Sequence, residues 1–326
     1  MKAKTKIALV LALLLIIATA SVLLLAERST TMQIKSRHFN FTLGVCTHGN
    51  ESSEITALKA GVRNFRTDIT LSASQIRLMD YEHERYNASY LGILDYDTLP
   101  GGSQDKNWSL SMWNESVKAA VEAYPWISEW EIWNEPWVKQ FQTGMVNGSA
   151  YNYFLIIKAA ANAIRSLEPN ATIVCFGGAP IGSPQIFEWY AEVWSYGAWK
   201  YCNAVSVHAY LPSPIVINFS DEWAQYLNAY ENLTHKPIFI TEFGFPASSK
   251  LIPGYSQKSQ MEFMEEGLDT FSSLPYIKQV YWYDLWGLSD GALGNDYGLL
   301  NLTNPSNGTP NLAWYTFLQA YRESSP

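Results

Sequence analysis

Blocks of apolar residues alternate with amphipathic blocks along most of the chain. Eight apolar runs have the length of buried strands, at residues 39–46, 62–69, 90–96, 129–135, 172–177, 204–210, 237–244 and 279–286. Segments of helical period follow them, at residues 55–60, 74–86, 111–123, 151–167, 186–199, 222–232, 257–271 and 312–322. The clearest helix, 151–167, collects its apolar residues on one face.

Eight strands, each followed by a helix, predict a (β/α)₈ TIM barrel in the α/β class. No linker or repeat divides residues 38–326, so we expect one domain there. A doubly wound open sheet is the alternative. That fold usually has a glycine-rich phosphate turn after its first strand, and Gly44-Val45-Cys46-Thr47-His48-Gly49 lacks the required spacing.

The first 26 residues read as an export segment. Lys2, Lys4 and Lys6 precede the uncharged, apolar residues 7–26. This stretch fits either a cleaved signal peptide or an uncleaved membrane anchor, and residues 27–37 would form a short connector. In both cases we expect the remainder outside the cytoplasm, either secreted or anchored at the cell surface.

Sequons for N-glycosylation agree with export. The chain carries eleven acceptors, Asn40, Asn50, Asn87, Asn107, Asn114, Asn147, Asn170, Asn218, Asn232, Asn301 and Asn307. We therefore expect a glycoprotein whose sugars lie on surface loops.

Charge and cysteine content narrow the possible partners. The chain has 22 Lys and Arg against 30 Asp and Glu, for a net charge of −8, without basic runs. This balance argues against nucleic acid as a partner. A bridge between Cys175 and Cys202 is conceivable, but we favour buried free thiols for these and for Cys46. No Cys/His cluster has metal-ligand spacing, so we expect no metal or cofactor. We also expect the protein to be a monomer.

Two short motifs end apolar runs and carry the candidate chemistry. They are Trp133-Asn134-Glu135-Pro136 and Thr241-Glu242-Phe243-Gly244. In a barrel, residues at the carboxyl ends of strands face the active site, so Glu135 and Glu242 should lie on opposite sides of one pocket. Two carboxylates, one giving a proton and one attacking, are the minimal equipment for breaking a glycosidic bond.

With these motifs the region from about Phe39 to Arg322 resembles the clan A glycoside hydrolases, retaining (β/α)₈ enzymes that include families 5 and 39. The resemblance implies that Glu135 is the acid/base and Glu242 the nucleophile. It implies that Asn134 donates to the 2-hydroxyl of the sugar, and that Arg66 keeps the nucleophile ionised. A plain ion pair inside the barrel is the alternative role for Arg66.

The resemblance extends to two further strands. His208 and Tyr210 match a His-x-Tyr pair in which the tyrosine approaches the nucleophile and the histidine orients substrate or acid/base. Period two points both to one face. Trp282 resembles the tryptophan platform under the sugar, with Trp286 as its rival. The run 92–96 lacks the family 5 histidine and is closer to family 39.

These features predict an exported, retaining endo-β-glycosidase acting on a β-linked polysaccharide such as a glucan, mannan or xylan. Trp108, Trp113, Trp137 and Phe141, after the third and fourth strands, are suited to extra sugar subsites, or else pack their loops. An exo-acting β-xylosidase or β-glucosidase and a transglycosylase are alternatives. A catalytically inactive, glycan-binding barrel is the alternative from another class.

Overall fold

A computed structural model describes residues 38–49, 51–102, 106–210, 219–248, 254–287, 289–290, 295–301 and 309–324. The predicted export segment 1–26 and connector 27–37 lie outside these residues. Phe39–Pro326 is one compact unit. None of the helices in the described part of the chain is long and apolar enough to cross a membrane.

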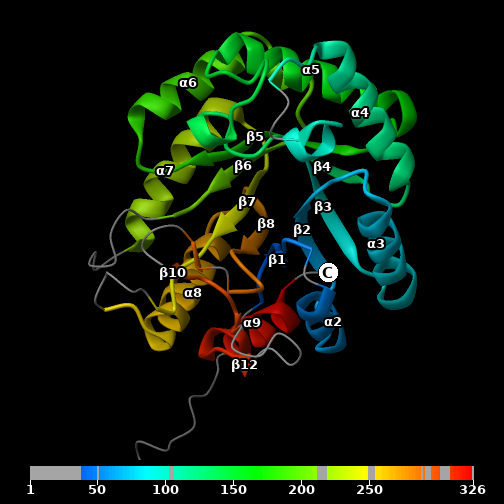
Figure 1. The fold of residues 1–326 in the computed structure, drawn as a ribbon. Coiled ribbons are helices and arrows are strands. Elements are labelled where there is room, and N and C mark those ends of the chain that lie inside the picture. The colour runs from blue at the N-terminus through cyan, green and yellow to red at the C-terminus, as the bar shows by residue number, and fades with distance from the viewer. Residues whose placement is uncertain are drawn as a thin grey trace, which may run out of the picture. The chain divides into compact units, whose positions relative to one another are not determined.

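Eight parallel strands close into a barrel in chain order (Figure 1). They are β1 (Thr42–Cys46), β2 (Asn64–Asp68), β3 (Ser89–Leu94), β4 (Glu129–Ile132), β5 (Thr172–Pro180), β6 (Ala204–His208), β7 (Ile238–Phe243) and β8 (Ile277–Trp282). The closing pair places Thr42 opposite Gln279 and Val45 opposite Trp282. Because β1 pairs with β8, the predicted TIM barrel is confirmed and the open sheet is excluded.

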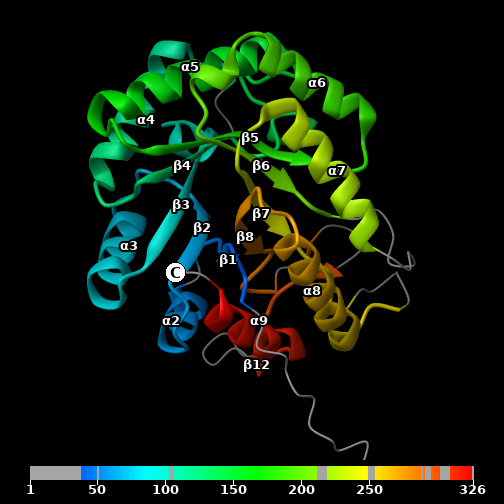
Figure 2. The same cartoon turned by 180° about the vertical axis from the view of Figure 1, so that it is seen from behind.

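Helices surround the barrel on its outside (Figures 1 and 2). They are α2 (Glu51–Lys59), α3 (Ala73–Tyr86), α4 (Leu110–Ala123), α5 (Ala150–Leu167), α6 (Pro184–Ser195), α7 (Phe219–Thr234), α8 (Gln257–Ser272) and α9 (Leu312–Glu323). The short 3-10 helices are η1 (Tyr96–Thr98), η3 (Lys139–Phe141) and η4 (Ala198–Lys200). After β8, β9 (Ser289–Asp290) pairs with β10 (Asn295–Asp296), and β11 (Leu300–Asn301) with β12 (Thr309–Pro310).

Local sequence explains where helices begin and end. The side chains of Ser109 and Ser149 cap α4 and α5 by accepting a hydrogen bond from the backbone N–H of the third helical residue, Met112 and Asn152 respectively. The segment 186–199, expected as one helix, is divided into α6 and η4. Gly197 lies between them with a φ of 97°, a left-handed conformation that stops a helix and favours glycine.

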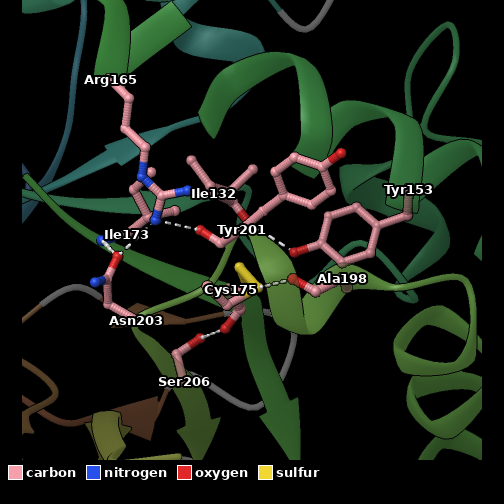
Figure 3. The surroundings of a disulfide bond; sticks show 10 residues. Ile132, Tyr153, Arg165, Ile173, Cys175, Ala198, Tyr201, Asn203 and Ser206 are labelled. Atoms are coloured by element: carbon pink, nitrogen blue, oxygen red, sulfur yellow. Dashed lines mark hydrogen bonds between the residues drawn. A yellow bond between two sulfur atoms is a disulfide. The ribbon is translucent and has the colours of Figure 1, made fainter. Parts of the chain in front are cut away.

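A disulfide bond joins Cys175 on β5 to Cys202 just before β6, with Cα atoms 5.7 Å apart. The preference for free thiols at these positions is therefore wrong, whereas Cys46 is free and buried. The reason is a tertiary contact between β5 and the segment just before β6. Asn203 binds the backbone of Ile173 through both its N–H and its side chain, which brings the two cysteines together (Figure 3).

Candidate active site

The segment that carries Glu135 leaves β4 through an unusual backbone path. Trp133 has a φ of 70° and Glu135 a φ of 43°, both left-handed, so the strand ends at Ile132 rather than at residue 135. The N–H of Glu135 donates to the carbonyl of Gly177 at 2.6 Å. Such conformations are costly for residues with a side chain and concentrate at functional sites. This path places the Glu135 side chain over the barrel, with 19% of it exposed.

Arg66 on β2 is the centre of the site and is 3% exposed. Its Nη1 donates to Oε1 of Glu242 at 2.6 Å, and its Nε donates to Oε2 of Glu131 at 2.6 Å. Its Nη2 donates to Oδ1 of Asn134 at 3.1 Å. With Oδ1 so held, the amide NH₂ of Asn134 is the group that remains for a substrate hydroxyl.

Glu242 lies on β7 with 10% of its side chain exposed. Its second oxygen, Oε2, accepts from the hydroxyl of Tyr210 at 2.8 Å. Burial alone would raise the pKa of Glu242, but the positive charges of His208 and Arg66 and the hydrogen bonds of Tyr210 and Arg66 outweigh it and lower that pKa. Glu242 is therefore held as a carboxylate, the state that a nucleophile requires.

His208 on β6 contacts both glutamates and is 1% exposed. Its Nδ1 lies 2.8 Å from Oε1 of Glu135, and its Nε2 lies 3.5 Å from Oε1 of Glu242. Burial lowers the pKa of His208, but the charges of both carboxylates outweigh it, so the pKa is raised. A Cβ at Gly178 would overlap Nε2 of His208, so only glycine leaves room for the ring. One imidazole thus joins the two carboxylates into a single site.

The tryptophan predicted as a platform for the sugar does not face the site. Trp282 is fully buried and packs edge-on against Phe243 at 4.9 Å, so the prediction that it lies under a sugar is wrong. Its neighbour Tyr283 is half-buried and lies 6.2 Å from the ring of Tyr210. Trp286 is also half-buried and stays a prediction.

The parity of β8 explains this error. Gln279 bonds Glu129 across the barrel, and Tyr281 bonds Gln279, so residues 279 and 281 face the interior. Tyr283 continues that series, while Trp282 points outward to the helices. The polar Gln279 was the sequence signal that could have revealed this.

The aromatic residues predicted to form extra sugar subsites also differ in burial. Trp108 and Trp113 are buried against Trp133, with ring centroids 5.8 and 5.7 Å from it, so their predicted role in sugar subsites is wrong. Phe141 is half-buried and stacks on Tyr96. Trp137 is half-buried as well, so these loop aromatics remain candidates for subsites.

Among the described residues, one group of carboxylates has the spacing of metal ligands. Asp68, Asp95 and Asp97 each place one oxygen within 4.8 Å of the others. His48 lies 3.7 Å from Asp68. Burial lowers the pKa of His48, but the hydrogen bond to Asp68 and the charges of Asp68 and Asp284 raise it to about 9. The positive charge of His48 thus offsets part of the negative charge of these carboxylates. The expectation of no metal stays a prediction.

Comparisons with known proteins identify the fold and the family. Residues 107–315 match the family model described as glycosyl hydrolase catalytic core, which covers well over half of the chain. No curated protein matches the sequence significantly.

Solved structures share the fold at low sequence identity. A family 39 glycoside hydrolase from Bacteroides cellulosilyticus WH2 superposes with a TM-score of 0.64 at 17% identity, covering 88% of this chain and 64% of that one. A β-D-glucuronidase of Dictyoglomus thermophilum gives 0.61 at 15%, covering 88% and 51%. The family 1 β-glucosidase of Thermotoga maritima gives 0.64 at 13%, covering 88% and 99%. The chain thus spans between half and two thirds of the first two proteins.

Proposed function

Because this chain belongs to the family of glycosyl hydrolase catalytic cores, we propose that it is a retaining β-glycosidase in which Glu242 is the nucleophile and Glu135 the acid/base. The observation that carries the assignment is the asymmetry between the two glutamates. Arg66 and Tyr210 bond both oxygens of Glu242 and keep it ionised. Glu135 is more exposed and has a histidine as its side-chain partner.

The first step forms a covalent intermediate. An oxygen of Glu242 attacks the anomeric carbon, and Glu135 gives its proton to the departing glycosidic oxygen, so the bond between carbon and oxygen breaks without releasing an alkoxide. Asn134, oriented by Arg66, donates to the 2-hydroxyl of the sugar as positive charge develops on the ring.

The second step reverses these roles. The Glu135 carboxylate takes a proton from water, whose oxygen attacks the anomeric carbon and releases Glu242 as a carboxylate. One water is consumed for each bond broken. Two inversions at one carbon return the β configuration.

The substrate is proposed to be an uncharged β-linked polysaccharide such as a glucan, mannan or xylan, cut internally. Charge supports a neutral sugar. Arg66 is already bonded to Glu131 and Glu242. The Asp68 carboxylate adds negative charge at the carboxyl end of β2. A uronic acid would therefore be repelled here, although three proteins of similar fold are glucuronidases.

A panel of substrates tests this proposal. Aryl β-glucoside, β-xyloside, β-mannoside and β-glucuronide are compared with the three polysaccharides, and products are sized. We expect neutral glycosides to be cleaved and the polymers to give mixed oligosaccharides, with NMR showing the β anomer first. Monosaccharide alone would indicate exo action, and preference for the glucuronide would refute the neutral subsite. No release by the wild type, with Glu242→Ala as the blank, would refute the activity.

Export and glycosylation are part of the proposal. The disulfide Cys175–Cys202 supports an oxidising compartment. Six of the acceptor asparagines have exposed side chains, Asn40, Asn87, Asn107, Asn147, Asn170 and Asn232. N-terminal sequencing and carbonate extraction of the native protein distinguish a cleaved signal from a membrane anchor. An intact mass without added sugar would refute glycosylation.

A further inference from the structure

A third glutamate lies beneath the proposed catalytic pair. Glu131 is on β4, four residues before Glu135, and is fully buried inside the barrel. Its Oε2 accepts from Nε of Arg66 at 2.6 Å. In the sequence it looks like one more residue of an alternating strand, and nothing there distinguishes it from Glu129.

The Arg66 guanidinium is shared between two carboxylates. Nε bonds Glu131 and Nη1 bonds Glu242, each at 2.6 Å, while Nη2 faces Asn134. A guanidinium is planar and presents its donors in a fixed fork, so an anchor at Nε sets the direction of the other two nitrogens. Glu131 therefore orients Arg66 toward both Glu242 and Asn134.

Sharing also divides the positive charge. The Glu131 carboxylate opposes part of the charge of Arg66, so Glu242 is stabilised as an anion less than it would be by Arg66 and His208 without Glu131. A nucleophile whose pKa is held too low attacks carbon more slowly.

We propose that Glu131 is a positioning residue of this site, which aims Arg66 and keeps Glu242 sufficiently basic to attack. This inference rests on the proposed function, with Glu242 as the nucleophile. The competing explanation is that Glu131 only neutralises a buried arginine.

The test separates charge from shape. Glu131→Gln keeps the size of the side chain and an oxygen acceptor for Nε, but removes the charge. Glu129→Gln is the matched control, because Glu129 is on the same strand and face and bonds Gln279 at 2.8 Å.

In Glu131→Gln the repulsion on Glu242 is removed and Arg66 acts on it undivided, so the pKa of Glu242 should fall further. The acidic limb of kcat/KM should move down by about one pH unit, which is tenfold in proton affinity. We expect kcat to fall about tenfold with KM little changed. Glu129→Gln should keep the wild-type limb. A limb that stays in place, or that moves equally in both variants, would overturn the proposal.

A readout without turnover keeps the result decisive. Carboxyl-labelled glutamate allows Glu242 to be titrated by ¹³C NMR, with its signal assigned by its loss in Glu242→Gln. A lower midpoint in Glu131→Gln supports the inference and an unchanged one overturns it, even if the wild type cleaves no glycoside and the proposed function fails. If Glu131→Gln does not fold, Glu131→Asp decides, because it keeps the charge and loses reach. Its kcat should fall with the limb unmoved, and an unchanged kcat would overturn the proposal.

Discussion

Removing the bridge between Cys175 and Cys202 should lower stability by an amount set by chain entropy. The two residues are 27 positions apart. Closing a loop of that length lowers the entropy of the unfolded chain and so raises its free energy by about 3.5 kcal/mol. For a domain of roughly this length the entropy of unfolding is about 0.6 kcal/mol/K, so Tm should fall by about 6 °C. The measurement is thermal unfolding of the double variant Cys175→Ala/Cys202→Ala.

Two controls separate the bridge from packing. Cys46→Ala removes a buried free thiol without opening a bridge and should cost about 1 kcal/mol. Thiol titration of the denatured, unreduced protein should find one reactive cysteine, rising to three after reduction. Three reactive thiols before reduction, or a Tm within 2 °C of wild type for the double variant, would refute the reasoning.

The remaining predictions concern the charges around Glu242. Tyr210→Phe removes a donor from Oε2, so kcat should fall about 10- to 100-fold and the acidic limb should move to higher pH, and an unchanged pH profile would contradict this. Because the pKa of Glu242 is lowered by folding, its contribution to stability is present above the unfolded value of about 4.3 and lost as pH falls through the folded pKa. Denaturant midpoints should therefore fall toward acid, and less steeply in Glu242→Gln. The raised pKa of His208 acts oppositely: its contribution is present below about 6.5 and lost as pH rises through the folded pKa, so His208→Gln should remove that alkaline loss.

The architecture could be predicted because burial acts on each element separately. Strands buried on both faces read as apolar runs, and helices read as amphipathic segments, so eight repeats specify the barrel. The motifs around Glu135 and Glu242 could be found for the same reason, since each follows directly on a buried strand. The match to glycosyl hydrolase catalytic cores confirms the resemblance that those motifs indicated.

What the sequence hid depends on contacts between distant elements. Gln279 reaches Glu129 across the barrel and thereby shows which residues of β8 face inward, and the polarity of Gln279 is the one sign of this in the sequence. Glu131 acquires its role only when Arg66 of β2 reaches it. The left-handed backbone at Trp133 and Glu135 could not be predicted, because neither residue is a glycine.

The central claim, that Glu242 attacks and Glu135 exchanges the proton, is tested most directly by azide rescue of two variants on an activated aryl β-glycoside. In Glu135→Ala a good leaving group needs no proton, so the covalent intermediate forms and azide attacks it to give a β-glycosyl azide. In Glu242→Ala no covalent intermediate forms, and azide attacks the β-glycoside itself to give an α-glycosyl azide. NMR of the isolated products assigns the anomers. Swapped anomers would reverse the two roles, and no rescue in either folded variant would contradict the account.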